Sequence, residues 1–422
     1  MVVGKLLVVA LLASTCIPSG VLGFKFKYHV PAISIAAIAM IGTHVYTLRN
    51  SPKRPAIPQH YFDLAKARFP NAADPTAPLQ GQVAIVTGSS SGLGKEIASE
   101  LYNLGATVVV ASRNKDKIQA VADDIRRQVG EGKPGSLVPM QLDSSDLDNV
   151  KEFVNAFKSR YQSLHWLVNN AGIHYATGAK DQVYKSKQGY DMAFATNYLG
   201  HFLLSELLLD KLAEAGAKQG VPTRIVNIAS TYHAQSDGLM LKSSHVDEAP
   251  YASRDEEDWS QRGLAYGNNK LAQVLHAREA TKRQSPELNK HVQFVSVCPG
   301  WVSTNILPEN FVGRFIGKRA FRVKEGALAG VSALLDTRLK GGEFVTNYKN
   351  FWLEQSWSPT FFKILNFLRI REVGAHILSM YVLLAQKYSY QFTISTSSPE
   401  SYDDELAKGL YDWSMKAISA YK

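Results

Sequence analysis

Cysteine is scarce in this chain of 422 residues, which contains only Cys16 and Cys298. Two cysteines exclude a disulfide-stabilised scaffold and a cysteine-rich zinc module. No HExxH or comparable histidine cluster occurs, so we predict no metal site. An acidic excess is also absent, because 47 Lys and Arg outnumber 37 Asp and Glu and give a net charge of +10. This balance favours an anionic partner such as a membrane surface, a nucleic acid or a phosphorylated cofactor, although a solvated basic surface explains it equally well.

The composition is otherwise that of a globular protein. Hydrophobic residues make up 45% of the chain and charged residues 20%, which excludes wholesale disorder. The length allows two or three domains, or one large α/β domain with extensions.

The first 50 residues differ from the rest. Lys5 precedes an apolar run over 6–13 that is typical of a signal peptide, and a second apolar run covers 29–46. Basic residues at 49–54 favour a cytosolic position for everything downstream. We therefore predict a signal-like and membrane-anchor segment over 1–50, with one uncleaved anchor or a buried hairpin as alternatives. Prolines such as Pro55 and Pro58 then predict a polar linker over 51–80.

From residue 82 onward, short β-branched runs alternate with amphipathic segments of helical length. The runs predict strands at 83–86, 107–111, 137–142, 164–168, 224–229 and 292–297, with one more at 342–346. Helices are expected at 94–104, 115–129, 146–161, 189–212, 266–280 and 324–335. Continuous apolar strands alternating with helices indicate an α/β fold with a doubly wound, Rossmann-type parallel sheet, here over 81–348.

The remaining C-terminal part holds two apolar stretches within 349–390, separated by charged residues. They favour two amphipathic helices in an insertion that covers a lipophilic substrate, lies in a membrane interface, or packs on the core of the protein itself. Residues 391–422 are expected to form a tail that packs on the catalytic domain.

A glycine-rich turn joins the first strand to the first helix of the sheet. The segment Thr87 to Gly94 reads TGSSSGLG. Glycine permits a tight turn at Gly88, close approach of a pyrophosphate at Gly92 and close helix packing at Gly94. The helix N-terminus favours phosphate. We expect this turn to bind a dinucleotide through Gly88, Ser90, Ser91, Gly92, Leu93, Gly94 and Lys95.

The end of the second strand discriminates between dinucleotides. An acidic side chain there would bind a ribose 2′-hydroxyl, but the sequence offers Ser112 and Arg113 instead. Arg113 can bind a 2′-phosphate through charge-assisted hydrogen bonds, and Lys95 can add a second positive charge. The sequence therefore predicts NADP(H) over NAD(H), unless Arg113 is an ordinary solvated arginine.

Other polar and small residues follow the later strands. Asp143 is placed to accept a hydrogen bond from an adenine amino group. Small residues after the fourth strand would let the backbone pass close to a nicotinamide ribose. Tyr266 and Lys270 are four apart at the start of a predicted helix and share one face. The further candidates are Asn170, Ala171, Gly172, Asn197, Ser230, Pro299, Gly300, Val302 and Thr304.

Together these residues resemble the short-chain dehydrogenase/reductase family. The resemblance covers about residues 80–348 and a tail segment at 410–414, and it includes the glycine turn, the Asn-Asn-Ala-Gly segment at 169–172 and the Pro-Gly pair at 299–300. It also includes Asn197, Ser230, Tyr266 and Lys270 in family order. Within the family the chain is similar to the retinol-dehydrogenase-like and WW-domain-oxidoreductase-like branch.

The resemblance implies a catalytic tetrad for hydride transfer between an alcohol and a carbonyl. Tyr266 would be the acid or base, and Lys270 with oxidised nicotinamide would lower its pKa from about 10. Ser230 would orient the substrate oxygen, and Asn197 would hold a water in a proton relay to Lys270. Tyr266 and Lys270 would both contact the cofactor.

Two departures from the family accompany this match. Asn269 stands where the family usually has a serine, and Ser230 and Tyr266 are 36 positions apart, beyond the usual gap. The loop between them contains an acidic stretch at 247–258 that we expect over the substrate mouth.

The sequence thus predicts a membrane-associated, NADP(H)-dependent oxidoreductase acting on a lipophilic alcohol or carbonyl of retinoid, steroid or isoprenoid type. We expect a catalytic domain facing the cytosol at the endoplasmic reticulum, no nucleic-acid partner, and leave a homodimer open. The alternatives are an NADP(H)-binding regulatory or scaffold protein without turnover, and a plastid reductase with a pigment-related substrate.

Overall fold

The computed structural model describes residues 56–130, 132–174, 185–236, 238–242, 259–304, 317–318, 320–348 and 390–422. The predicted membrane segment at 1–50, almost all of the insertion at 349–390 and the acidic loop at 247–258 lie outside these ranges. Within them, no helix combines the length and the apolar character needed to cross a membrane.

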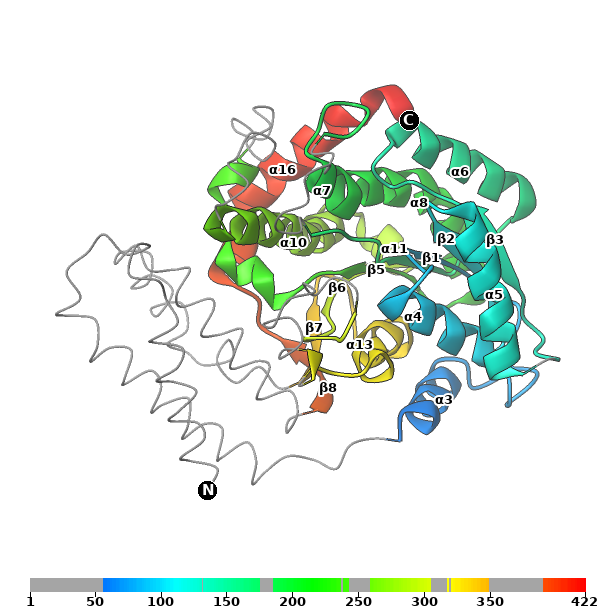
Figure 1. Cartoon of the computed structure of the whole chain (residues 1–422). Coiled ribbons are helices and arrows are strands. Elements are labelled where there is room, and N and C mark those ends of the chain that lie inside the picture. The colour runs from blue at the N-terminus through cyan, green and yellow to red at the C-terminus, as the bar shows by residue number, and fades with distance from the viewer. Residues whose placement is uncertain are drawn as a thin grey trace, which may run out of the picture.

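One eight-stranded sheet forms the centre of the described structure (Figure 1). Its strands lie in the order β3-β2-β1-β4-β5-β6-β7-β8. Their bounds are β1 Val83–Thr87, β2 Thr107–Ser112, β3 Leu137–Gln141, β4 Trp166–Asn169, β5 Thr223–Ile228, β6 Val292–Cys298, β7 Phe344–Tyr348 and β8 Tyr390–Ser395. Strands β1 to β7 are parallel, which confirms the predicted doubly wound sheet. The sequence did not predict β8, which pairs with β7 in antiparallel fashion.

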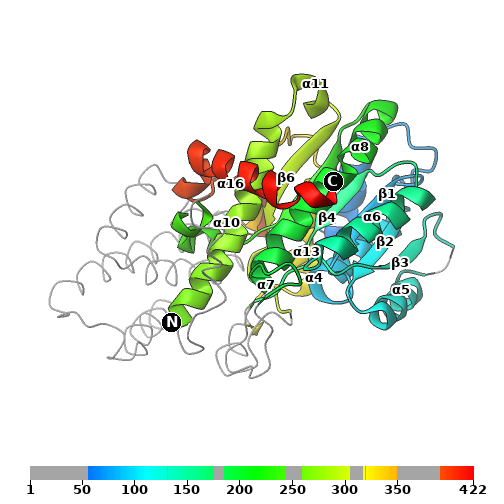
Figure 2. The ribbon, with the colours of Figure 1, turned by 90° about the horizontal axis from the view of Figure 1, so that it is seen from above.

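Helices cover both faces of this sheet, as continuous apolar strands require. The main helices are α3 Ile57–Arg68, α4 Gly92–Asn103, α5 Lys115–Val129, α6 Leu147–Arg160, α8 Gly200–Gln219, α10 Trp259–Arg283, α13 Val323–Leu335 and α16 Asp404–Ala417. Residues of α3, α4, α5 and α13 pack with Ala84 and Val86 in one core. Residues of α6, α8, α10 and α16 pack with Ile85 in the other (Figures 1 and 2). Alternate residues of β1 therefore belong to opposite layers.

The strand order places a topological switch between β1 and β4. The chain leaves β1 through α4 on one face and enters β4 after α6 on the other. In open α/β sheets a ligand binds at this point, beside the carboxyl ends of the strands. Both the glycine turn after β1 and the segment after β4 lie there.

The predicted linker contains a helix. Residues Ile57–Arg68 form α3, in which Pro58 occupies the first turn. Tyr61 and Ala65, four residues apart, are buried against the core. Residues 57–68 therefore belong to the folded domain, because an apolar stripe at helical spacing is buried there despite the nearby prolines.

Helix α10 is longer than the sequence predicts. It begins at Trp259 rather than at Tyr266 and ends at Arg283. Tyr266 and Lys270 consequently lie within the helix and not in its first turn, where ends fray. Figure 2 shows α16 crossing α10 on its outer side, where Leu410 and Trp413 are buried.

Candidate active site

The glycine turn is packed against the segment that follows β4. Gly88 has φ +64°, and a Cβ atom there would lie 2.7 Å from the Cα atom of Ala171. A Cβ atom on Gly94 would lie 2.6 Å from the carbonyl oxygen of Gly88. Side chains at these two positions would force the turn and the segment apart, so both requirements that the sequence assigned to glycine are present.

Thr87, which was not among the predicted site residues, connects the two segments. Its Oγ1 atom accepts hydrogen bonds from the backbone N–H groups of Asn170 and Ala171, each at 2.9 Å. The Asn170 side chain donates in return to the carbonyl oxygen of Thr87 at 2.8 Å. The position of Thr87 as the last residue of β1 was the available signal. This network makes the turn and the Asn-Asn-Ala-Gly segment one rigid unit.

The N-terminus of α4 fits a phosphate group. Ser91 directly precedes the helix, and its side chain makes no capping hydrogen bond to the first amides of α4. Gly92 has φ +55°, and a Cβ atom there would lie 3.3 Å from Thr304. Leu93 lies half-buried in the first turn. Free amides at the end of a 12-residue helix, beside a glycine cradle, suit a pyrophosphate.

The segment after β6 approaches the same turn from the other side. Pro299 and Gly300 are half-buried, and Gly300 has φ +78°. Val302 is 7% exposed and bridges to Phe321. Thr304 lies against Gly92. The predicted cofactor residues at 299–304 are therefore brought to the glycine turn, although they follow it by some 200 positions in the sequence.

The adenosine end of the predicted ligand would lie beyond β2 and β3. Arg113 is exposed and follows the end of β2. Ser112 donates to Ser90 at 3.0 Å. Lys95 forms an ion pair with Asp124 of α5, so part of its expected charge is already compensated.

Asp143 follows β3, as predicted. Its Oδ1 atom accepts hydrogen bonds from the N–H and hydroxyl groups of Ser145, at 3.0 and 2.6 Å. These contacts fix the direction of the carboxylate at the carboxyl edge of the sheet.

Asn197 lies in a π-helical turn, Ala195–Leu199, directly before α8. Its Oδ1 atom accepts from the N–H group of Ile173 at 2.8 Å, and its Nδ2 atom donates to the carbonyl oxygen of Ile173 at 3.0 Å. A Cβ atom on Gly172 would lie 3.4 Å from Asn197 Oδ1 and 3.8 Å from Lys270 Nζ. The side chain that we expected to hold a water thus also anchors the segment after β4, and π-helical turns are frequent at functional sites.

Lys270 and Tyr266 are in contact beneath the carboxyl end of β5. The Lys270 Nζ atom lies 5.5 Å from the centroid of the Tyr266 ring and donates to the carbonyl oxygen of Ile228 at 2.7 Å. Ser230 follows two residues later and begins a 3₁₀ turn, Thr231–Gln235, in which it accepts from the N–H group of Tyr232 at 3.2 Å. The structure therefore gathers Gly172, Asn197, Tyr266 and Lys270, with the Ser230 turn beside them.

Burial determines the titration of this pair. Removal from water lowers the pKa of Lys270 to about 7, against a small opposing effect of Cys298. Burial also raises the pKa of Tyr266 above its ordinary value, and Tyr232 and Cys298 act in the same direction. Without cofactor the pKa of Tyr266 therefore lies above its ordinary value, because desolvation is the largest effect. The lowering expected from Lys270 together with oxidised nicotinamide stays a prediction.

Aromatic side chains that the sequence analysis did not single out surround Tyr266. The ring centroids of His174 and Tyr232 lie 4.9 and 5.8 Å from that of Tyr266. Tyr232 in turn packs edge-on against Trp301 at 5.6 Å. No periodicity marks these residues, because they come from three separate loops after β4, β5 and β6.

A doubly wound sheet with a glycine-rich turn, and a tyrosine ring in contact with a buried lysine at its carboxyl edge, is typical of dinucleotide-binding oxidoreductases. Comparison with known proteins makes the class specific. Residues 82–240 match the family described as short chain dehydrogenase.

Relatives extend this match beyond residue 240. The chain is 34% identical to retinol dehydrogenase 11 of Homo sapiens over 232 residues, which span 55% of this chain and 64% of that protein. It is 31% identical to the short-chain dehydrogenase TIC 32 B, chloroplastic, of Brassica napus over 274 residues, which span 63% of this chain and 79% of that protein. The chain belongs to the short-chain dehydrogenases, in their retinol-dehydrogenase-like branch, and is thus related to oxidoreductases of alcohols and carbonyls.

The fold is also that of a solved structure. A putative uncharacterized protein from Mycobacterium paratuberculosis superposes with a TM-score of 0.54 at 22% identity, covering 81% of this chain and 94% of that one. This likeness confirms the Rossmann-type fold.

Proposed function

We propose that the protein is an NADP(H)-dependent oxidoreductase that interconverts a lipophilic alcohol and its carbonyl, with Tyr266 as the acid or base. The contact of a buried lysine with the Tyr266 ring, at the edge of the sheet where the glycine turn lies, is the observation that supports this most. A lysine is rarely buried without a function, because desolvation disfavours its charge.

Each residue of the site has a chemical role in this proposal. Bound NADP(H) would supply or accept the hydride. Tyr266 donates its phenolic proton to the carbonyl oxygen during reduction and takes it back during oxidation. Lys270 stabilises the phenolate that remains, and Ser230 orients the substrate oxygen. The raised pKa keeps Tyr266 protonated at neutral pH in the protein without cofactor. For efficient proton transfer, Lys270 and the bound cofactor would have to bring that pKa closer to the working pH.

The cofactor preference rests on the end of β2. No acidic side chain follows the strand, and exposed Arg113 comes directly after Ser112. An arginine there can bind a 2′-phosphate that a carboxylate would repel. NADP(H) is therefore the proposed cofactor, bound also by the glycine turn and the 170–172 and 299–304 segments.

The proposed substrate class follows from the surroundings of Tyr266. His174, Tyr232 and Trp301 place ring surface around the phenol, where a lipophilic molecule can pack. A relative named retinol dehydrogenase is consistent with such a substrate.

Membrane association and location rest on the sequence. The apolar runs before residue 50 support an anchor at the endoplasmic reticulum with the catalytic domain facing the cytosol. A relative named chloroplastic keeps the plastid as the alternative. Imaging of a tagged copy and sequencing of the mature N-terminus distinguish the two locations, and sedimentation distinguishes a homodimer from a monomer.

The test is a screen of NADPH oxidation over lipophilic aldehydes and ketones, with small polar carbonyls as controls. We expect turnover of lipophilic carbonyls by the full chain in detergent, and a loss of roughly 10³-fold in kcat/KM in Tyr266→Phe with NADPH affinity retained. Turnover of polar carbonyls alone would contradict the substrate class. Tight NADPH binding without turnover of any carbonyl would instead identify a regulatory protein.

A further inference from the structure

Lys270 has a side-chain partner that the tetrad does not include. Its Nζ atom donates to the Oε1 atom of Gln273 at 2.9 Å, besides the bond to the carbonyl oxygen of Ile228 at 2.7 Å. Gln273 lies one helical turn further along α10 and is 2% exposed, and Lys270 is 3% exposed. Two of the three N–H groups of the ammonium thus donate to Ile228 and Gln273, and the third can point towards Tyr266 or a ligand.

The orientation of the Gln273 amide is set by this contact. Lys270 can only donate, so the amide must direct its oxygen towards Nζ. Its Nε2 group is then buried without a hydrogen-bond partner among the described residues. A buried, unsatisfied N–H group is unfavourable. The amide therefore has an orientation that provides an acceptor for Lys270 but leaves its own Nε2 group without a hydrogen bond.

We propose that Gln273 is a positioning residue that keeps the Lys270 side chain protonated and directed at Tyr266. The proposal rests on the proposed function only in the use that the enzyme makes of the lysine. The charge of Lys270 can be measured whether or not the protein turns over a substrate.

The surroundings of Lys270 explain why an amide oxygen matters. Among the described residues, three titratable groups face it: Tyr266 on α10, Cys298 at the end of β6 and His201 on α8. Burial lowers the pKa of His201 to about 4 and raises the pKa of Tyr266, so both are neutral near pH 7. No described carboxylate is among the groups that shift the pKa of Lys270. The ammonium therefore depends on two neutral oxygens, and only that of Gln273 belongs to a side chain.

The experiment is a titration of Lys270 by NMR in the full chain carrying ¹³Cε-labelled lysine. The resonance of a lysine that titrates near neutral pH is separate from the others, and its loss in Lys270→Met assigns it. We expect Gln273→Met to lower the pKa of Lys270 by about one unit, because a hydrogen-bond acceptor for the charged form is lost. Gln273→Glu is expected to raise it by at least about one unit, because a carboxylate favours the charge.

Gln284→Met is the matched control, since it makes the same substitution just beyond the end of α10, and it should leave the titration of Lys270 unchanged. Thermal unfolding shows that each variant is folded. If Gln273→Met does not fold, the test is the expected rise of the Lys270 pKa in Gln273→Glu. An unchanged titration in the folded Gln273 variants overturns the proposal.

Kinetics distinguish this result from a failure of the proposed function. In a working reductase the pH at which kcat/KM declines on the alkaline side should move down in Gln273→Met and up in Gln273→Glu. If the wild-type protein turns over no carbonyl, the NMR shifts remain and only the proposed function fails. Opposite shifts in the two variants would not arise from a merely structural role.

Discussion

A buried cation lies at each end of strand β5, and the two cations differ in their hydrogen-bond partners and in their pKa values. Near the amino end, Arg224 is 1% exposed and donates to Gln293 Oε1 and to the carbonyl oxygens of Ala333 and Leu339, at 2.8 to 3.0 Å. At the carboxyl end, Lys270 binds the carbonyl oxygen of Ile228 and Gln273. Burial lowers the pKa of Arg224 only to about 10, whereas it lowers that of Lys270 to about 7.

The difference separates a stabilising cation from a reactive one. Arg224 stays charged at every physiological pH, because Asp336 and Glu343 oppose the effect of burial. Lys270 has no such carboxylate among the described residues and lies beside a phenol instead. Arg224 at the amino end of the strand thus contributes to stability, whereas the protonation of Lys270 at the carboxyl end changes with small shifts in pH or surroundings.

Replacement of Lys270 should give the largest change in stability. The unfolded chain binds a proton at this lysine up to pH 10.5 and the folded chain only up to about 7, so the free energy of unfolding of the wild type rises with pH across this window. We expect Lys270→Met to raise that free energy at pH 6 by up to about 4 kcal/mol, because the charge penalty of roughly 5 kcal/mol is partly offset by the donor that the Ile228 and Gln273 oxygens lose. Near pH 10.5, where the charge penalty is gone, the same loss should make the variant slightly less stable than the wild type.

Urea unfolding at pH 6, 8 and 10 measures this prediction. Activity should be lost at every pH, because the phenolate loses its cation. A variant that is destabilised at pH 6 would contradict the account of Lys270 as a buried, poorly compensated charge.

Replacement of Arg224 should have the opposite sign. Arg224→Leu leaves three buried acceptors without their donor, and we expect a loss of about 3 kcal/mol in the free energy of unfolding. The folded fraction should keep its cofactor affinity, since the residue lies at the far end of the strand. Arg127→Leu, on the exposed face of α5, is the control and should change stability by less than about 0.5 kcal/mol. If Arg224→Leu destabilised the protein no more than Arg127→Leu does, Arg224 would not be a stabilising cation, and the contrast with Lys270 at the other end of β5 would be lost.

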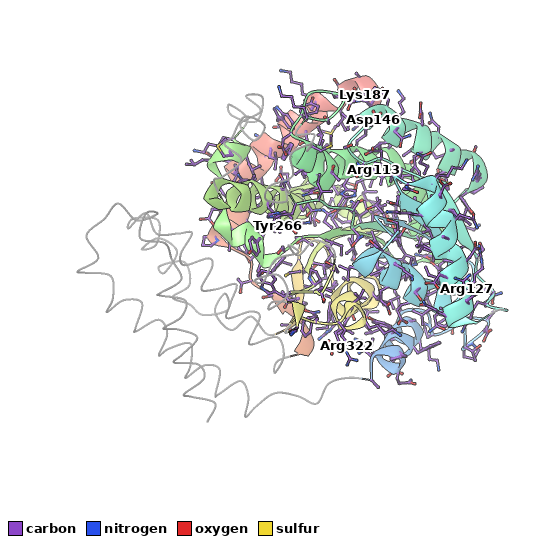
Figure 3. All side chains as sticks on the ribbon, in the orientation of Figure 1. Arg113, Arg127, Asp146, Lys187, Tyr266 and Arg322 are labelled. Carbon is purple, nitrogen blue, oxygen red and sulfur yellow. The ribbon has the colours of Figure 1, made fainter. Side chains whose placement is uncertain are left out.

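Replacement of Arg113 should have the smallest effect on stability, because this cation is exposed to water in the folded protein. Arg113→Glu should reduce the preference for NADPH over NADH by roughly 10- to 100-fold without a change in stability, since only the 2′-phosphate distinguishes the two cofactors. The ratio of the two dissociation constants, measured by fluorescence, tests this. Arg127→Glu is the matched control (Figure 3). A preference that survives in Arg113→Glu would assign the 2′-phosphate site to other residues.

The sequence predicted the sheet well because its strands are buried on both faces. β2 and β6 stand out as β-branched runs, and α5 was predicted with the bounds that the structure has. Helix α3 was missed because prolines near it indicated a linker, while the stripe that includes Tyr61 and Ala65 is too short to outweigh them. The eighth strand was missed although Tyr390, Phe392 and Ile394 alternate with polar residues at the period of a strand.

The structure brings together site residues that the sequence motifs single out, but their electrostatics depend on burial that no motif reveals. Motifs identify Tyr266 and Lys270, yet the direction of a pKa depends on how much water the fold removes. The roles of Thr87 and Gln273 follow from distances of 2.9 Å between residues whose types are unremarkable in the sequence. The rings of Tyr232 and Trp301 meet only because the loops after β5 and β6 are neighbours in the sheet.

The central claim is that the Tyr266 phenol, beside buried Lys270, becomes an effective acid or base once a positively charged nicotinamide is added. The most direct measurement is the phenolate absorbance of the wild type minus that of Tyr266→Phe, titrated with and without oxidised cofactor. The account predicts that Tyr266 remains protonated beyond pH 10 in the free protein, and that oxidised cofactor lowers its pKa by at least about two units. A pKa of Tyr266 that cofactor leaves unchanged would contradict it.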